Sequence, residues 1–202
     1  MAGHVTDLVL TLLDDVERSA LRGAYDLHDK VQRLNRIRDF RIVERAILWC
    51  ASDEMKLKQL GGDALVVPER LSDSEIDRVA ALSRDDNAEV RSWAIFLFSS
   101  QCDADSERIR EILIERSTDS HDETRGEAIL ALAKRKDARA TDLIVRELES
   151  DIVGKLAVEA AEELGDPRLL LALLHIKSWW DVDESLLESA IKACGGRCEA
   201  SE

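Results

Sequence analysis

The stretch HDETRGEAILALAKRKDARA, residues 121–140, decides how the chain is organised. Its charged start, its small and apolar residues at helical spacing and its polar end predict an amphipathic helix followed by a turn. The hexad AILALA at its centre has counterparts elsewhere: AILWCA from Ala46, AIFLFS from Ala94, AVEAAE from Ala157 and AIKACG from Ala190. The first alanines of the five hexads are 48, 34, 29 and 33 residues apart. Because the last three spacings suit a helix pair with two short turns, the stretch is interpreted as one copy of a repeat.

The repeat predicts an all-α chain of helix pairs, since only two prolines and nine glycines interrupt 202 residues. We expect one domain over 1–202 that begins with capping helices in 1–37. Residues 38–71 are expected to hold the first helix of the type that comes second in each pair, followed by an insertion loop. Regular repeats should follow in 72–196, and a flexible tail in 197–202. The loop is expected within KQLGGDALVVPERLSDSEID because GG and Pro are typical of loops. The predicted helices are 73–84 with 88–101, 106–118 with 123–136, 140–150 with 154–165, and 168–179 with 184–195, preceded by 38–52 and by one or two helices in 5–34.

The residues around the hexads also repeat. DDNAEVRSWA and DSHDETRGEA each place an arginine three residues before the first alanine, and the turns KDAR and LGDPR follow two of the hexads. This pattern resembles the HEAT-like repeats of the phycobilisome-lyase type, well over 72–196 and moderately over 38–52. Two helices depart from it, since Gly154 and Leu187 stand where the arginine is expected. The resemblance implies a right-handed α–α superhelix of about five helix pairs, in which the turn acids and arginines are structural: Asp86, Asp122, Arg91 and Arg125.

The net charge of the chain is −14, and the excess of acidic over basic residues grows toward the C-terminus. An acidic surface repels phosphate backbones, which argues against nucleic-acid binding and favours a basic protein partner. The N-terminal residues lack a secretion signal, and no segment approaches the roughly 20 apolar residues of a membrane span. The four cysteines form no CxxC pair, which is typical of reduced thiols, and we expect a cytoplasmic protein.

No motif predicts catalysis, a cofactor or a metal site. Cys50 and Cys194 fall at apolar positions of their hexads and are expected to be buried, while Cys194 and Cys198 alone supply too few ligands for a metal. The four histidines are scattered, and there is neither a phosphate-binding glycine loop nor a GxSxG sequence. We therefore expect a protein that is not an enzyme.

The resemblance implies that the second helix of each pair lines a concave face. The residues one before and two after each first alanine are expected to point toward that face, where polar side chains are usual. Large apolar residues occur there instead, with acids beside them. We predict a partner-binding surface at these positions: Trp93, Phe96, Leu130, Glu127 and Glu159. The alternative is that the N-terminal helices or the 55–71 loop cover it.

Two further segments are candidates for surface functions. Trp179 and Trp180 stand in a turn where earlier repeats have polar residues, and they either form a secondary surface or seal the end of the stack. KVQRLNRIRDFR, residues 30–41, holds five basic residues and one acid. It either contacts an acidic partner, pairs with acids of neighbouring repeats or is a solvated face.

The leading hypothesis is a non-catalytic protein-binding scaffold, in its most concrete form an immunity- or inhibitor-type protein that blocks a basic partner. The resemblance to the phycobilisome-lyase type implies an alternative, a bilin lyase or a subunit that assists one, which would need a groove for an acidic tetrapyrrole. A HEAT-like nucleic-acid-binding protein is the third hypothesis. It would need a basic channel, whereas this chain is basic only near residues 30–45.

Overall fold

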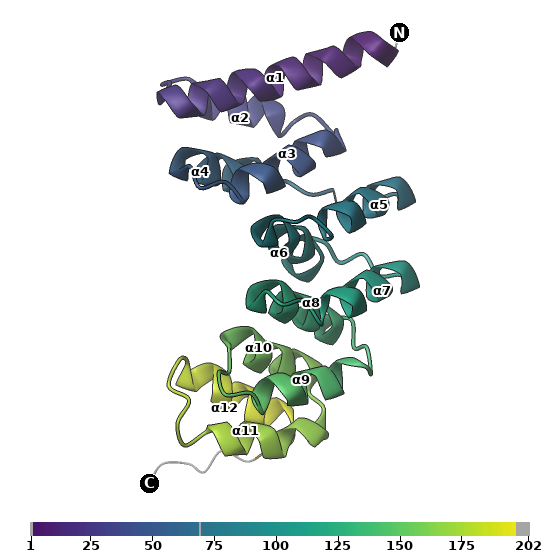
Figure 1. The fold of residues 1–202 in the computed structure, drawn as a ribbon, viewed down its shortest axis with the longest axis vertical. Coiled ribbons are helices and arrows are strands. Elements are labelled where there is room, and N and C mark those ends of the chain that lie inside the picture. Colours follow the sequence, from purple (N-terminus) through teal and green to yellow (C-terminus); the bar gives the residue numbers. More distant parts are fainter. Residues whose placement is uncertain (1, 69, 197–202) are drawn as a thin grey trace. The chain divides into compact units, whose positions relative to one another are not determined.

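The structure is a computed structural model that describes residues 2–68 and 70–196, with side chains from Leu8 onward. All regular elements in this part of the chain are helices, as predicted (Figure 1). The tail expected at 197–202, and Cys198 within it, lie outside the described residues. The chain forms two compact units, residues 1–97 and 98–202, where we expected a single domain.

Unit 1 consists of three successive pairs of helices, and the order of its elements is as follows: α1 (Ala2–Arg22), α2 (Leu27–Leu34), α3 (Phe40–Cys50), α4 (Met55–Ala64), α5 (Asp73–Leu82) and α6 (Ala88–Phe96). Helix α5 begins with a capping box, in which Ser72 accepts from the amide of Glu75 and the Glu75 carboxylate accepts from that of Ser72. Helices α3 and α6 begin with side-chain caps from Asp39 and Asn87. The predicted helices therefore start where short polar side chains satisfy the free amides of a first turn.

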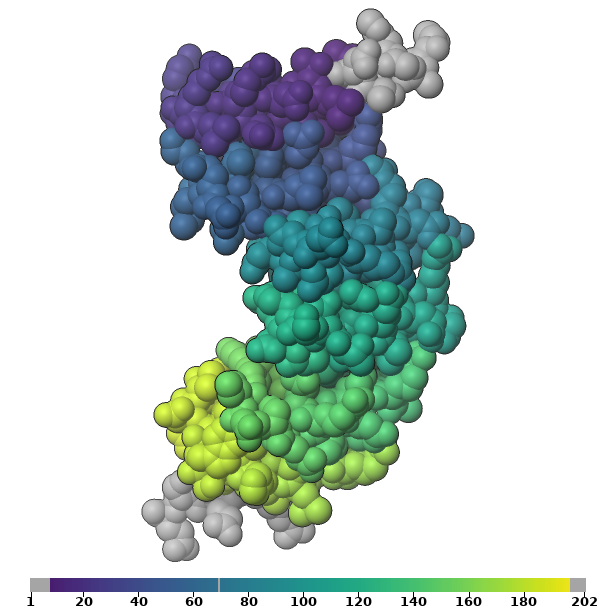
Figure 2. Space-filling view, in the orientation of Figure 1, coloured from purple at the N-terminus to yellow at the C-terminus, as the bar shows by residue number. Residues whose placement is uncertain are grey.

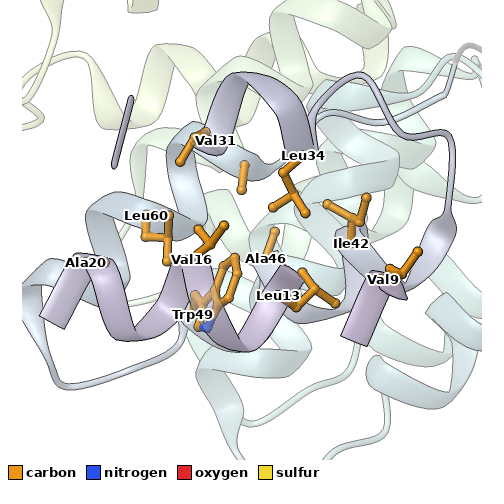
Figure 3. Close-up of a cluster of buried hydrophobic side chains, with 11 residues drawn as sticks. Val9, Leu13, Val16, Ala20, Val31, Leu34, Ile42, Ala46, Trp49 and Leu60 are labelled. Carbon is orange, nitrogen blue, oxygen red and sulfur yellow. The ribbon is translucent and has the colours of Figure 1, made fainter. Parts of the chain in front are cut away.

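The core of unit 1 lies beneath α1, which contributes a single apolar stripe. Val9, Leu13, Val16 and Ala20 recur at the spacing of one helical face and are buried. They pack with apolar residues of α2, α3 and α4 (Figure 3): Val31, Leu34, Ile42, Ala46, Trp49, Leu60 and Ala64. The Trp49 indole donates to Glu17 Oε2 over 2.8 Å, so its polar atom has a partner inside the core.

The predicted loop around Gly61 and Gly62 is wrong, because these residues lie inside α4. A Cβ on Gly61 would approach the Cys50 amide nitrogen to 2.5 Å and the Ala46 carbonyl oxygen to 2.8 Å. Gly61 is therefore required where the backbones of α3 and α4 meet, and close packing outweighs its low helix propensity. Helix α4 also accounts for the long first spacing between hexads.

Unit 2 contains the later repeats, and Figure 1 shows its helix pairs as successive layers from teal through green to yellow, which Figure 2 shows as adjoining bands of the same colours. Within it, α8, α10 and α12 pack side by side. Its elements are the end of the π-helical turn η1 (Leu97–Gln101), α7 (Glu107–Arg116), α8 (Asp122–Lys134), α9 (Ala140–Leu148), α10 (Lys155–Leu164), the 3-10 turn η2 (Pro167–Leu169), α11 (Leu170–Ile176) and α12 (Glu184–Ala193).

The turns of unit 2 are closed by aspartates and arginines, as the resemblance implies. Asp119 accepts from the His121 amide at 2.9 Å, while Arg125 donates to the Asp119 carbonyl at 3.0 Å and to Glu147 at 2.7 Å. The acid of this turn is thus Asp119, whereas Asp122 pairs with Arg125 at 2.9 Å and the cap of α8 is His121, whose Nδ1 accepts from the Thr124 amide. In unit 1, Asp85 accepts from the Asn87 amide at 2.8 Å, and Arg91 donates to the carbonyls of Asp85 and Asp86 at 3.0 and 3.1 Å.

A second turn has the sequence Asp-x-Arg. Asp137 Oδ1 accepts from the Arg139 amide at 3.0 Å and from Arg139 Nε at 2.9 Å. Asp166 and Arg168 form the same arrangement, with an amide contact of 2.9 Å. A third copy, missed in the sequence, is Asp39-Phe40-Arg41 before α3, with an amide contact of 3.0 Å. The pattern would have identified it, because the carboxylate must both cap a helix and receive the guanidinium two residues later.

Candidate partner-binding surface

The predicted surface residues divide between the two units. Trp93 and Phe96 lie on α6 of unit 1, whereas Glu127, Leu130 and Glu159 lie on α8 and α10 of unit 2. The structure therefore describes two separate surfaces on the second helices of the pairs. Each is considered by itself.

In unit 1 the surface is aromatic. Trp93 and Phe96 are both half-buried and stand edge to face, with ring centroids 5.3 Å apart and an angle of 76° between the rings. This arrangement is favourable for two aromatic rings and fixes both side chains. Helix α3 packs against α6 and carries Leu48, an exposed residue at the corresponding position of its own hexad. These three residues supply a partly exposed apolar surface.

In unit 2 Leu130, which the sequence assigned to the partner-binding surface as either exposed or covered, is buried. Its side chain is 4% exposed, and every residue from Gly126 to Ala133 is buried. The expectation of an amphipathic helix at 121–134 fails for the same reason: α8 is a central helix, apolar and small over most of its circumference. Gly126 allows the close approach of α10, since a Cβ there would lie 2.8 Å from Leu156 Cδ1.

Glu127 is also largely buried, at 8% exposure, and is not an open contact residue. It accepts a hydrogen bond from Ser99 Oγ, and the Ser99 carbonyl accepts one from Lys134 Nζ at 2.7 Å. Burial raises the pKa of the Glu127 carboxyl, and the carboxylates of Glu123 and Glu159 add to this effect. The three acids are therefore close enough to influence one another.

The exposed edge of α10 is the most acidic part of this surface. Glu159 is half-buried and its carboxylate lies 3.8 Å from Lys155 Nζ, which is closer, at 3.2 Å, to Asp183. Glu162 and Glu163 follow at helical spacing, and Glu162 accepts from Ser189 of α12. Sequence reasoning missed Glu162, although its position three residues after Glu159 placed it on the same edge. We call Glu123, Glu127, Glu159, Glu162 and Glu163 the acidic face of unit 2.

The two neighbouring tryptophans have different surroundings. Trp180 is 5% exposed and its indole Nε1 donates to the Val153 carbonyl at 2.9 Å, so it anchors the turn after α11 to the turn before α10. Trp179 is 48% exposed. Of the predicted secondary surface, Trp179 remains and Trp180 belongs to the interior.

The basic segment 30–41 is partly neutralised within unit 1. Lys30 Nζ lies 2.8 Å from Asp15 Oδ2, and Arg41 pairs with Asp39. The other three basic residues are exposed: Arg33, Arg36 and Arg38. Lys30 thus pairs with an acid of α1, Arg41 pairs within the segment, and the three exposed arginines form a solvated face.

Cys50 and Cys194 are buried, as predicted, and burial raises the pKa of each thiol to about 11. Both are protonated near neutral pH and are poor nucleophiles. In the part of the chain that the structure describes, no three His, Cys, Asp or Glu side chains come together to hold a metal ion. Among the helices of residues 2–68 and 70–196, none has both the length and the apolar character needed to cross a membrane.

Comparison with known proteins supports the repeat. Residues 77–165 match the family described as HEAT repeats. The chain is 30% identical over 191 residues to protein YibA of Escherichia coli K12 and to YibA of E. coli O157:H7, covering 92% of this chain and 66% of each relative. It thus spans just under two thirds of the length of these curated relatives.

The X-ray structure of E. coli YibA is also similar. It aligns with a TM-score of 0.60 and 26% identity, over 93% of this chain and 69% of that one. The match to HEAT repeats agrees with the hexads, the turn aspartates and the arginines, while the phycobilisome-lyase type stays a prediction. The repeated helix pairs agree with these matches, and residues 77–165 are similar to HEAT repeats.

Proposed function

We propose that this repeat scaffold is a non-catalytic cytoplasmic protein that binds a basic surface of another protein. The acidic face of unit 2 is the observation that carries the proposal. Residues 98–202 hold 24 acidic and 14 basic residues, a net charge of −10, against −4 for residues 1–97. Such a charge attracts a basic partner and accelerates its association.

The contacts within the acidic face support a binding role. Lys155 lies closer to Asp183 than to Glu159, and the nearest hydrogen bond to Glu162 comes from the neutral Ser189. At Glu162 a basic side chain of a partner would therefore add a charge-assisted bond, and at Glu159 it would compete with the 3.8 Å contact to Lys155. The pKa of Glu127 is raised first by burial, and the carboxylates of Glu123 and Glu159 raise it further.

The aromatic pair of unit 1 offers a second type of contact. Trp93 and Phe96 hold each other in place, so binding would cost little side-chain entropy. Large aromatic residues are frequent among those that dominate binding energy. We propose this pair as an apolar contact of unit 1, considered separately from the acidic face of unit 2.

The most concrete form of the proposal is an immunity- or inhibitor-type protein. In this form the acidic face covers a basic or catalytic site of its partner and blocks it. Buried thiols of high pKa and the structural use of the turn aspartates support a role without catalysis by this chain.

The test begins with affinity purification of the partner from the native organism, followed by calorimetry with the purified partner. The double variant Glu159→Lys/Glu162→Lys should weaken binding at least tenfold, and added salt should weaken wild-type binding. Asp53→Lys is the matched control, because Asp53 is exposed in the turn before α4 and far along the chain from the acidic face. Equal loss in the control, or salt-independent binding, would exclude recognition by the acidic face.

The aromatic anchor is tested separately. Trp93→Ala and Phe96→Ala should each weaken binding by about 2 kcal/mol if these residues dominate the interface. Tyr25→Ala serves as the control, since Tyr25 is a fully exposed aromatic residue of the same unit. Unchanged affinity in both variants would remove this surface from the proposal. Stoichiometric loss of the partner's activity on binding would support the blocking role, and full activity in the complex would exclude it.

A further inference from the structure

Unit 2 carries a second candidate surface, which the acidic face does not include. It is a groove of about 310 Å³ between the end of α9 and helix α11, and we call it the Trp179 groove. Its lining combines buried, half-buried and exposed residues: Leu148, Glu149, Ser150, Leu171, Ala172, His175 and Trp179. Leu171 is 80% exposed and Trp179 is 48% exposed, so the groove presents apolar side chains directly to solvent.

The backbone around the exposed Trp179 is held in place by hydrogen bonds. The neighbouring Trp180 is buried and bonded to the Val153 carbonyl, and the amides of Trp179 and Trp180 both donate to the Ile176 carbonyl, at 3.1 and 2.9 Å. The turn is therefore held at its backbone and by one large side chain. A partner that contacts Trp179 meets an aromatic residue whose backbone is already ordered, which lowers the entropic cost of binding.

The charged residues around the groove favour a partner of positive charge. Glu149 lines it, Asp151 follows in the same turn, and Asp181 stands two residues after Trp179. All three acids are exposed, and none forms an ion pair with a residue of the described chain. Lys177 is the one basic residue in the turn after α11, so the surroundings of the groove are negative.

We propose that the Trp179 groove docks a short basic segment of another protein, in which an aliphatic or aromatic side chain is flanked by Lys or Arg. The apolar side chain would occupy the space between Leu171 and Trp179, while the flanking cations would approach Glu149, Asp151 and Asp181. The volume is at the small end of ligand pockets, which extend from about 300 Å³, and suits one or two inserted side chains.

The same charges argue against two other occupants. In a symmetric dimer through this groove, identical acidic rims would face each other and repel. An anionic membrane surface would be repelled for the same reason. The inference stands on the groove itself and holds or fails independently of the acidic face.

The test is a selection from a display library of random 16-residue peptides on the full-length protein, with counter-selection on Trp179→Ala. Peptides enriched on the wild type alone should carry Lys or Arg next to a large apolar residue. The strongest such peptide should lose at least tenfold in affinity on Trp179→Ala and on Asp151→Asn/Asp181→Asn, and be unaffected by Tyr25→Ala. The thermal midpoint of Trp179→Ala should equal that of the wild type, because the side chain is exposed.

Several results would overturn the proposal. These are enrichment of neutral or acidic peptides, equal binding by Trp179→Ala, and no peptide that distinguishes the two proteins. A dimer in sedimentation that Trp179→Ala dissociates would assign the groove to a second copy of this chain instead. Glu159→Lys/Glu162→Lys should retain the peptide, which separates failure of this inference from failure of the acidic face.

Discussion

Units 1 and 2 use the same turn sequence, Asp-x-Arg, in different surroundings. In unit 1 the Asp39 side chain is 24% exposed and, among the described residues, its ion pair is with Arg41. In unit 2 the Asp137 side chain is 7% exposed and is bonded by both Arg139 and Arg110, at 2.7 and 3.1 Å. The Asp-x-Arg turn is thus a partly exposed cap at Asp39 and a buried link between helices at Asp137. Its contribution to stability should differ accordingly.

The units also differ in how their cores are assembled. Unit 1 is closed by a long helix that lays one apolar stripe over α2, α3 and α4, whereas unit 2 is built around the almost fully buried α8. Trp49 is a buried member of the first cluster, next to Val16 in Figure 3. A substitution in the core of one unit, followed by measurement of the stability of both units, tests this difference most directly.

Trp49→Ala should have the largest effect, about 3–5 kcal/mol of lost stability, because it removes a buried aromatic side chain. Hydrogen exchange by mass spectrometry should show lost protection mainly in residues 2–97. Leu132→Ala, at a fully buried position of α8, is the reciprocal variant and should affect residues 98–196. Equal loss of protection throughout the chain in both variants would show one cooperative unit instead of two.

Asp137→Ala should cost about 2–3 kcal/mol, because it removes the buried carboxylate that Arg110 and Arg139 share and leaves the Arg139 amide without its acceptor. Asp39→Ala should cost about 1 kcal/mol, since water replaces its partner more easily. Urea unfolding of both variants measures the difference, and equal losses would contradict the role of burial. Hydrogen bonds from Arg139 hold the pKa of Asp137 well below its usual range. The stability it contributes is therefore present above its unfolded pKa of about 3.9 and is lost as the pH falls below that value.

Gly61 of α4 and Gly126 of α8 each lie where two helices approach closely, so substitutions there compare helix packing in the two units. Gly61→Ala should cost about 1–3 kcal/mol, because its Cβ meets the backbone of α3. Gly126→Ala should change stability by less than about 1 kcal/mol, since the obstacle is the movable Leu156 side chain and alanine improves helix propensity by about 1 kcal/mol. Thermal denaturation of the two variants side by side gives the order. A larger loss for Gly126→Ala would reverse the assignment of rigid and yielding contacts.

The smallest expected effect is the dependence of stability on pH that Glu127 causes. The pKa of Glu127 is raised by burial, so the folded protein binds this proton more tightly than the unfolded chain does. Its contribution to stability is present below the unfolded pKa of about 4.3 and is lost as the pH rises through the folded value. Glu127→Gln should remove this pH dependence and leave stability at pH 7 equal or higher. A variant that is less stable at pH 7 yet equal at pH 4 would show that the ionised carboxylate is the favoured form.

Much of the fold followed from the sequence because each helix carries local signals. The hexads identified the second helices of the pairs, and short polar residues such as Asn87 and Asp183 capped them near the predicted starts. Gly61 was misassigned because a glycine pair in a loop and a glycine at a helix contact look alike until the partner helix is known. Asp39 needed only the Asp-x-Arg pattern already visible at Asp137.

The candidate surfaces were harder to predict. The rule that assigned Leu130 and Glu127 to an exposed row assumes a helix with one free side, and α8 has none over most of its length. Trp179 and Trp180 are adjacent and chemically identical, so only a distant acceptor, the Val153 carbonyl, separates the buried one from the exposed one. Exposure of individual side chains thus depended on contacts between repeats, which local patterns do not encode.

The buried thiols give the two units an internal chemical reporter. Cys50 belongs to unit 1, Cys102 and Cys194 belong to unit 2, and all three are shielded in the folded protein. In a Cys198→Ser background, a thiol reagent can react with each site only when its own unit opens. Peptide mapping of the modified cysteines would then time the opening of each half of the chain under native conditions, without any added label.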